Sequence, residues 1–126
     1  MSQTANFAST PWSKIIDISA ANTNRDGTGT IVGASIGATG GRVDRIEIKA
    51  IGTTTSGVIR AYKRAAAGVW KLWREYAVSN ITPSALVATF AVRDDDIGEI
   101  LEPNMEVGFS THNAEAFAAH VSGGVF

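Results

Sequence analysis

Short apolar runs separated by turn-forming residues constrain the fold of this chain more than any other feature. From Lys14 onward, these runs alternate with glycine, threonine, asparagine and proline. Pairs such as Asp26-Gly27, Gly40-Gly41 and Pro103-Asn104 mark turns between them. Short strands at regular spacing, joined by such turns, indicate an all-β fold, either a sandwich or a barrel.

The clearest runs have a period of two, which places alternate side chains on a buried face. We predict about eight strands, at residues 14–20, 29–36, 42–51, 57–64, 69–78, 85–93, 105–110 and 116–122. The core residues that we expect on them are Ile46, Ile48, Leu86, Phe90, Val107 and Phe109. Val43 is out of phase with Ile46, which predicts a β-bulge near Asp44. Eight strands would suit a jelly roll, and a short helix at residues 114–119 is the main alternative to the last strand.

The length of 126 residues suits a single domain. Residues 14–126 carry the strand pattern, so we assign them to a β-sandwich domain. Residues 1–13 have no regular period and are predicted to form an extended N-terminal arm, because Pro11 disfavours helix. Phe7 and Trp12 are the candidate anchors by which this arm would bind a neighbouring subunit. A frayed terminus is the alternative.

Charge and composition exclude several classes of partner. The formal net charge is −1, and nothing in it suggests the concentrated basic surface that nucleic acid or an anionic membrane requires. Cysteine is absent, which excludes disulfides, thiol catalysis and zinc–thiolate sites. No long apolar run is present to span a membrane, and the N-terminus does not have the pattern of a secretory signal. We therefore expect a protein made in a cytoplasm.

Two polar or acidic segments have some features of calcium sites. Residues 22–27, Asn-Thr-Asn-Arg-Asp-Gly, match the start of a calcium loop, but loop position twelve is Gly33 instead of glutamate. A glycine-rich turn is the better interpretation. Asp94, Asp95 and Asp96, with Glu99 and Glu102, are interpreted as a solvated loop that resists edge-to-edge strand pairing. We predict no metal and no cofactor.

Catalytic patterns are weak throughout the sequence. Residues 33–37 match G-x-S-x-G, but this motif acts only at a strand–turn–helix elbow with a histidine and an acid nearby. His112 and His120 do not have a zinc-ligand spacing. We therefore predict that the protein is not an enzyme.

Aromatic and cationic residues alternate between positions 60 and 76. Trp70, Trp73 and Tyr76 could stack on a glycan or on bases. Alternation would place Trp70 and Trp73 on opposite faces of a strand unless a bulge intervenes, so at least one is expected in the core. A hairpin with one core tryptophan and a charged outer face is the simpler interpretation.

Several segments together resemble a known group of proteins. They are Asn22–Gly29, Arg45–Ala50 with Gly52-Thr53-Thr54, Leu72–Glu75 and Ser110–Phe117. The chain resembles a family of small, mostly uncharacterised proteins of tailed bacteriophages and prophages, over nearly all of its length after the N-terminal arm. No functional residue can be carried over from that family.

The resemblance implies a virion component made in the bacterial host cytoplasm. A small β domain of this kind looks like a capsid decoration (cement) protein, which stabilises a phage head by binding across capsomers. Its expected partners are the major capsid protein and copies of itself, as a homotrimer. The alternative is a receptor- or glycan-binding module of a tail or head fibre, using Trp70, Trp73 and Tyr76.

Overall fold

The structure is a computed structural model that describes residues 10–126, and all of its regular elements are β-strands. The strands are β1 (Thr10–Ile18), β2 (Val32–Ser35), β3 (Gly41–Ala50), β4 (Gly57–Arg64), β5 (Lys71–Val78), β6 (Ala91–Asp94), β7 (Glu99–Leu101), β8 (Glu106–Thr111) and β9 (Phe117–Val125). This confirms the all-β prediction. No helix in the described part of the chain is long and apolar enough to cross a membrane.

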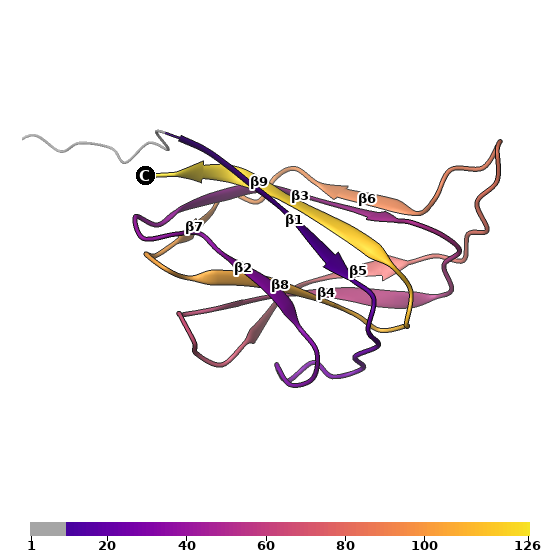
Figure 1. Cartoon of the computed structure of the whole chain (residues 1–126), viewed down its shortest axis with the longest axis horizontal. Coiled ribbons are helices and arrows are strands. Elements are labelled where there is room, and N and C mark those ends of the chain that lie inside the picture. Colours follow the sequence, from indigo (N-terminus) through magenta and orange to yellow (C-terminus); the bar gives the residue numbers. More distant parts are fainter. Residues whose placement is uncertain (1–9) are drawn as a thin grey trace, which may run out of the picture.

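The strands form two antiparallel sheets packed face to face (Figure 1). The five-stranded sheet has the order β1-β9-β3-β6, with β7 also paired to β3, and the four-stranded sheet has the order β2-β8-β4-β5. If the short β7 is left out, the strands pair as β1 with β9, β2 with β8, β3 with β6, and β4 with β5. The chain is therefore one long antiparallel hairpin wrapped into two sheets, which is the jelly-roll arrangement.

The central strand β3 shows why the sequence alternation works. Ile46 and Ile48 are 1% and 0% exposed, while Arg45 and Lys49 lie on the outer face. The register between β3 and β9 shifts between Val43 and Arg45, which confirms the bulge predicted near Asp44. The extra residue lets Val43 face the core together with Ile46, although three positions separate them in the sequence.

The core lies between the sheets, and most of its predicted members are there. Ile46, Ile48, Phe90, Val107 and Phe109 are all buried. The prediction that Leu86 belongs to the core is wrong, because its side chain is 96% exposed. It belongs to the long loop of residues 79–90 between β5 and β6, whereas the predicted strand 85–93 is paired only from Ala91 onward. The period of two was present, but no neighbouring strand pairs with the first half of this segment.

Two boundaries also differ from the sequence predictions. Residues 114–119 do not form the alternative helix, because β9 begins at Phe117 and pairs with both β1 and β3. The first strand begins at Thr10, so residues 10–13 of the predicted arm belong to the five-stranded sheet. Phe7 lies outside the described residues.

Phe90 supplies a test of the core. Its ring meets that of Phe117 edge to face, with the ring centres 6.3 Å apart. Phe90→Ala should lower the free energy of unfolding by about 3–5 kcal/mol, because it leaves a cavity beside Phe117. Leu86→Ala is the matched control and should change it by less than about 0.5 kcal/mol. Chemical denaturation measures both, and equal losses would show that the loop is part of the core.

Candidate functional site

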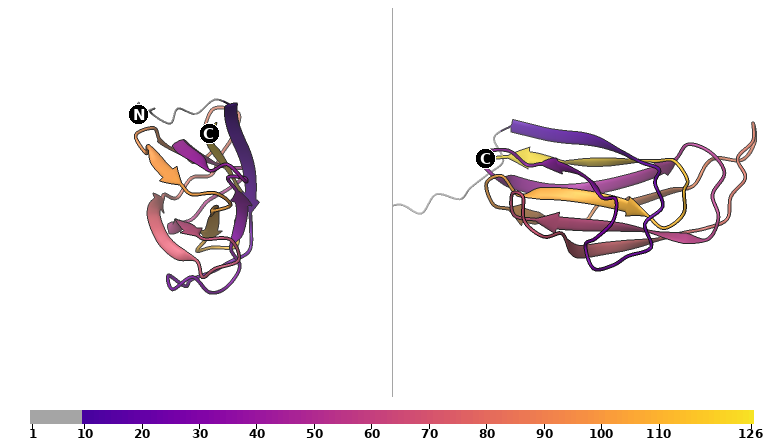
Figure 2. Two further views of the ribbon diagram at one scale, coloured as in Figure 1. Left: turned by 90° about the vertical axis from the view of Figure 1, so that its left-hand side faces the viewer. Right: turned by 60° about the horizontal axis from the view of Figure 1, so that its bottom comes forward.

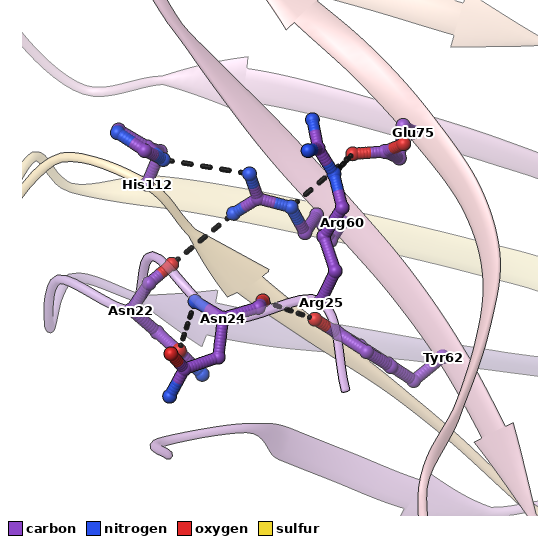
Figure 3. A network of polar contacts seen from close by, with 7 residues as sticks. All are labelled: Asn22, Asn24, Arg25, Arg60, Tyr62, Glu75 and His112. Atoms are coloured by element: carbon purple, nitrogen blue, oxygen red, sulfur yellow. Dashed lines mark hydrogen bonds and ion pairs between the residues drawn. The ribbon is translucent and has the colours of Figure 1, made fainter. Parts of the chain in front are cut away.

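A buried arginine organises the polar cluster on the outer face of the four-stranded sheet (Figure 3). Arg60 of β4 is only 2% exposed. Its Nε donates to Glu75 Oε2 at 3.2 Å, its Nη1 donates to the Asn22 carbonyl at 3.2 Å, and its Nη2 lies 3.4 Å from His112 Nδ1. A buried guanidinium is tolerated only when its donors are paired in this way. The cluster therefore ties β4, β5 and two connecting segments together.

The segment of residues 19–31, between β1 and β2, covers this face of the sheet. Its fold depends on Asn22, whose side-chain amide donates to the carbonyls of Thr28 at 2.9 Å and Thr30 at 3.1 Å. The Asn22 backbone N–H donates to the Thr111 carbonyl, and the Tyr62 hydroxyl donates to the Asn24 carbonyl, both at 2.8 Å. The covering segment is thus closed on itself and attached to the sheet.

Two glycines make this close packing possible. Gly27 and Gly29 have φ angles of 89° and 83°, in the region that favours glycine. A Cβ on Gly27 would lie 2.2 Å from the Trp70 carbonyl oxygen, and one on Gly29 would lie 2.7 Å from the Asn22 side chain. The N-x-N-x-D-G pattern therefore builds a turn, as the sequence analysis favoured over a calcium loop.

The electrostatics of the cluster place two guanidinium groups around one carboxylate. Arg25, which is 61% exposed, also donates to Glu75 Oε2, at 2.8 Å. The hydrogen bond from Arg25 is the main reason that the pKa of Glu75 is lowered, with Arg60 adding to it against the opposing effect of burial. The arrangement can hold the covering segment on the sheet. Arg60 itself is too buried to reach a ligand.

The structure does not bring Trp70, Trp73 and Tyr76 onto one recognition surface. Trp70 is 9% exposed and packs over Gly33 and Gly108, with the Arg64 guanidinium 4.1 Å from its ring centre. Trp73 and Tyr76 instead pack against the core on the other side of the sheet. A register shift between β4 and β5 makes Trp73 the extra residue of a bulge. Even with this bulge, Trp70 and Trp73 lie on opposite faces of the sheet.

Trp73 and Tyr76 take part in polar contacts that join the two sheets. Arg74 and Lys63 lie 5.4 Å and 5.7 Å from the Trp73 ring centre. Asp94 of β6 accepts hydrogen bonds from Arg74 Nη1 at 3.0 Å and from the Tyr76 hydroxyl at 2.8 Å. These groups therefore have partners within the protein, including one member of the acidic run that we expected to be solvated.

Trp12, one of the two predicted arm anchors, is half-buried. It lies on β1 and packs against the core. The other anchor, Phe7, lies outside the described residues.

The remaining motifs have local structural roles. Ser35 lies on β2, and its Oγ accepts a hydrogen bond from the Gly37 N–H at 3.0 Å, with no helix after it. Asp26 accepts from the Thr28 N–H at 3.1 Å, and its pKa is lowered mainly by the Thr28 side-chain hydrogen bond. Within residues 10–126, no three histidine, aspartate or glutamate side chains are grouped so as to hold a metal ion.

Arg60 was the residue that sequence reasoning missed. It was grouped with the surface cations around Trp70, although it interrupts the apolar run Val58-Ile59-Arg60-Ala61-Tyr62. A charged residue in the middle of such a run was the available signal, because both faces of that strand are buried.

Removal of the Arg60 guanidinium should loosen the covering segment. We expect Arg60→Met to lower the free energy of unfolding by about 2 kcal/mol, because charged hydrogen bonds are lost. Hydrogen exchange should show faster opening of residues 19–31. Arg25→Met is the control, since its exposed ion pair should contribute less than about 1 kcal/mol. If both variants lose the same stability, the burial of Arg60 is not what anchors the segment.

We expect the free energy of unfolding to fall at alkaline pH because of Tyr76. Burial, followed by the hydrogen bond to Asp94, raises the pKa of Tyr76 well above its usual range. The unfolded chain would ionise this phenol near pH 10 while the folded chain keeps it neutral, so stability is full below about pH 10 and falls as the pH rises further. Denaturation midpoints measured on either side of that pH should show the decline, and Tyr76→Phe should reduce it. An unchanged slope in the variant would contradict this account.

Comparison with known proteins gives no family for this chain. No protein-family model matches it. No curated protein matches it. Among solved structures, one chain of the T13 IBDV viral particle aligns with 98% of this chain and 34% of its own length, with a TM-score of 0.40 and 11% sequence identity. The chain thus spans about a third of that viral chain, and a similarity of this size assigns no function.

Proposed function

We propose that the protein is a structural component of a phage virion, a decoration protein that binds the head shell through its five-stranded sheet. The observation that carries the proposal is the difference between its two outer faces. The outer face of the four-stranded sheet is covered by residues 19–31, and Arg60 and Tyr62 on it are 2% and 0% exposed. Within residues 10–126, no comparable segment covers the outward side chains of the five-stranded sheet.

At its centre the open face carries the small side chains of Ala118 and Ser122 on either side of His120. Ala118, His120 and Ser122 point outward from β9 and are half-buried among the side chains of the adjacent strands. On one side, Ile15 of β1 pairs with His120 and is 67% exposed. On the other side, Glu47 of β3 pairs with His120. A face that combines small, charged and apolar side chains suits contact with another protein surface.

The sequence resemblance and the fold support the same role by analogy. The resemblance is to tailed-phage virion proteins, and jelly rolls are common in viral capsid and lectin domains. Fold alone does not separate these two roles. The placement of the aromatic residues favours the first, because Trp70 is on the opposite side of its sheet from Trp73 and Tyr76, and Trp70 and Tyr76 are buried.

Binding to phage heads that lack the protein tests the proposal. Ala118→Arg adds a long charged side chain at the centre of the open face, pointing away from the core, so it should abolish co-sedimentation with the heads while leaving the melting temperature nearly unchanged. Ala66→Arg, in the exposed turn between β4 and β5, is the matched control and should bind normally. Normal binding by Ala118→Arg would exclude this face as the contact. Failure of the unchanged protein to bind any head shell would refute the role itself.

A further inference from the structure

The loop of residues 79–90 projects beyond the end of the sandwich (Figures 1 and 2). It contains no charged residue. Its tip exposes Leu86 by 96% and Val87 by 48%. Projecting loops usually carry polar turn residues, because their side chains face water. An uncharged loop that presents apolar side chains at its tip has the composition of a contact surface.

Local hydrogen bonds brace the tip. Ser84 and Val87 exchange both backbone hydrogen bonds, at 3.0 Å and 3.3 Å, which makes Ala85 and Leu86 the two central residues of a tight hairpin turn. Ser84 Oγ also accepts from the Leu86 N–H at 3.2 Å. Nearer the sandwich, Ile81 exchanges backbone hydrogen bonds with the buried Thr54 at 2.9 Å and 3.1 Å. A preformed tip loses little conformational entropy when it binds.

A pocket on the same molecule has the size and lining to receive such a tip. It has a volume of about 190 Å³ and lies beside the end of β1 and the start of β2. Ile18, Ala20, Val32 and Phe109 contribute its apolar lining, and Asp17 is its one charged residue. An apolar cavity of roughly 150 Å³ can hold benzene, so this pocket has room for a leucine side chain.

The pocket and the tip cannot meet within one molecule. The strand orders place β1 and β2 at one edge of the sandwich and β6 and β5 at the other. The pocket adjoins the first edge, while the loop of residues 79–90 joins the strands of the second and points away from the sandwich (Figure 1). A contact between them must therefore join two copies of the chain.

We propose that Leu86 of one copy inserts into this pocket on a second copy, so that the protein associates head to tail. Because the two surfaces differ, the contact is heterologous, and repetition of it gives a ring or an open chain. One tip buries far less than the roughly 1,600 Å² of a standard interface, so each contact is weak and a closed ring gains from making several at once. The inference does not depend on binding to a virion.

Directed cross-linking tests the contact, because the chain has no native cysteine. One sample carries Leu86→Cys and the other carries Ala20→Cys. After oxidation, the mixture should form a disulfide-linked dimer that contains one copy of each variant. Neither variant alone should do so, and neither should Val69→Cys with Ala20→Cys, since Val69 is equally apolar and 67% exposed in a different turn. Cross-linking of Leu86→Cys with itself would overturn the proposal, because it would indicate contact between two tips.

Sedimentation at increasing concentration gives an independent measure. The unchanged protein should form oligomers that dissociate on dilution. Leu86→Asp and the pocket-filling Ala20→Phe should each shift it to a monomer, whereas Val69→Asp should not. A strict monomer at millimolar concentration would overturn the proposal. So would loss of association by Leu86→Asp together with full association by Ala20→Phe, because the tip would then bind elsewhere.

Discussion

The pairing of β9 with both β1 and β3 is the constraint on which the rest of the jelly roll depends. Residues from the first and last described strands become neighbours, with Thr10 opposite Val125. β9 also meets β3 at the bulge, where a Cβ on Gly123 would lie 1.8 Å from the Arg42 carbonyl oxygen. The bulge that lets Val43 face the core therefore requires a glycine on the partner strand. The inward position of Val43 in β3 and the glycine at position 123 of β9 therefore depend on each other.

The outer faces of the two sheets differ in whether another part of the described chain covers them. The four-stranded sheet is covered by its own chain, and the buried charge of Arg60 is compensated by Glu75 and the Asn22 carbonyl. Since a buried charge is costly without such partners, the covering segment and the sheet stabilise each other. In the described part of the chain, no segment covers the outer side chains of the five-stranded sheet. The four-stranded sheet thus uses its outer face for the stability of the protein itself.

The parts of the fold that could be predicted are those determined by neighbours in sequence. Ile46, Ile48 and the nearby bulge follow from local alternation in β3. Leu86 shows the limit of this reasoning, because a period of two indicates which residues share a face but not whether anything covers that face. The apolar run around Arg60 could have indicated that it is buried, but not what it binds, since one of its partners, the Asn22 carbonyl, lies almost forty residues earlier in the chain. The nesting of the strands is likewise a long-range property that no single run of residues contains.

The position of the two chain ends has a practical consequence for engineering. Because Thr10 and Val125 are paired, the described ends of the chain lie together at the end of the sandwich opposite the projecting loop (Figure 1). A short linker could join them, and new ends could be opened in the turn at residues 65–68 between β4 and β5, giving a circular permutant with the same strand pairs. A peptide fused after Phe126, or before Thr10 in a chain shortened to begin there, would leave from this same end of the sandwich, away from the loop of residues 79–90.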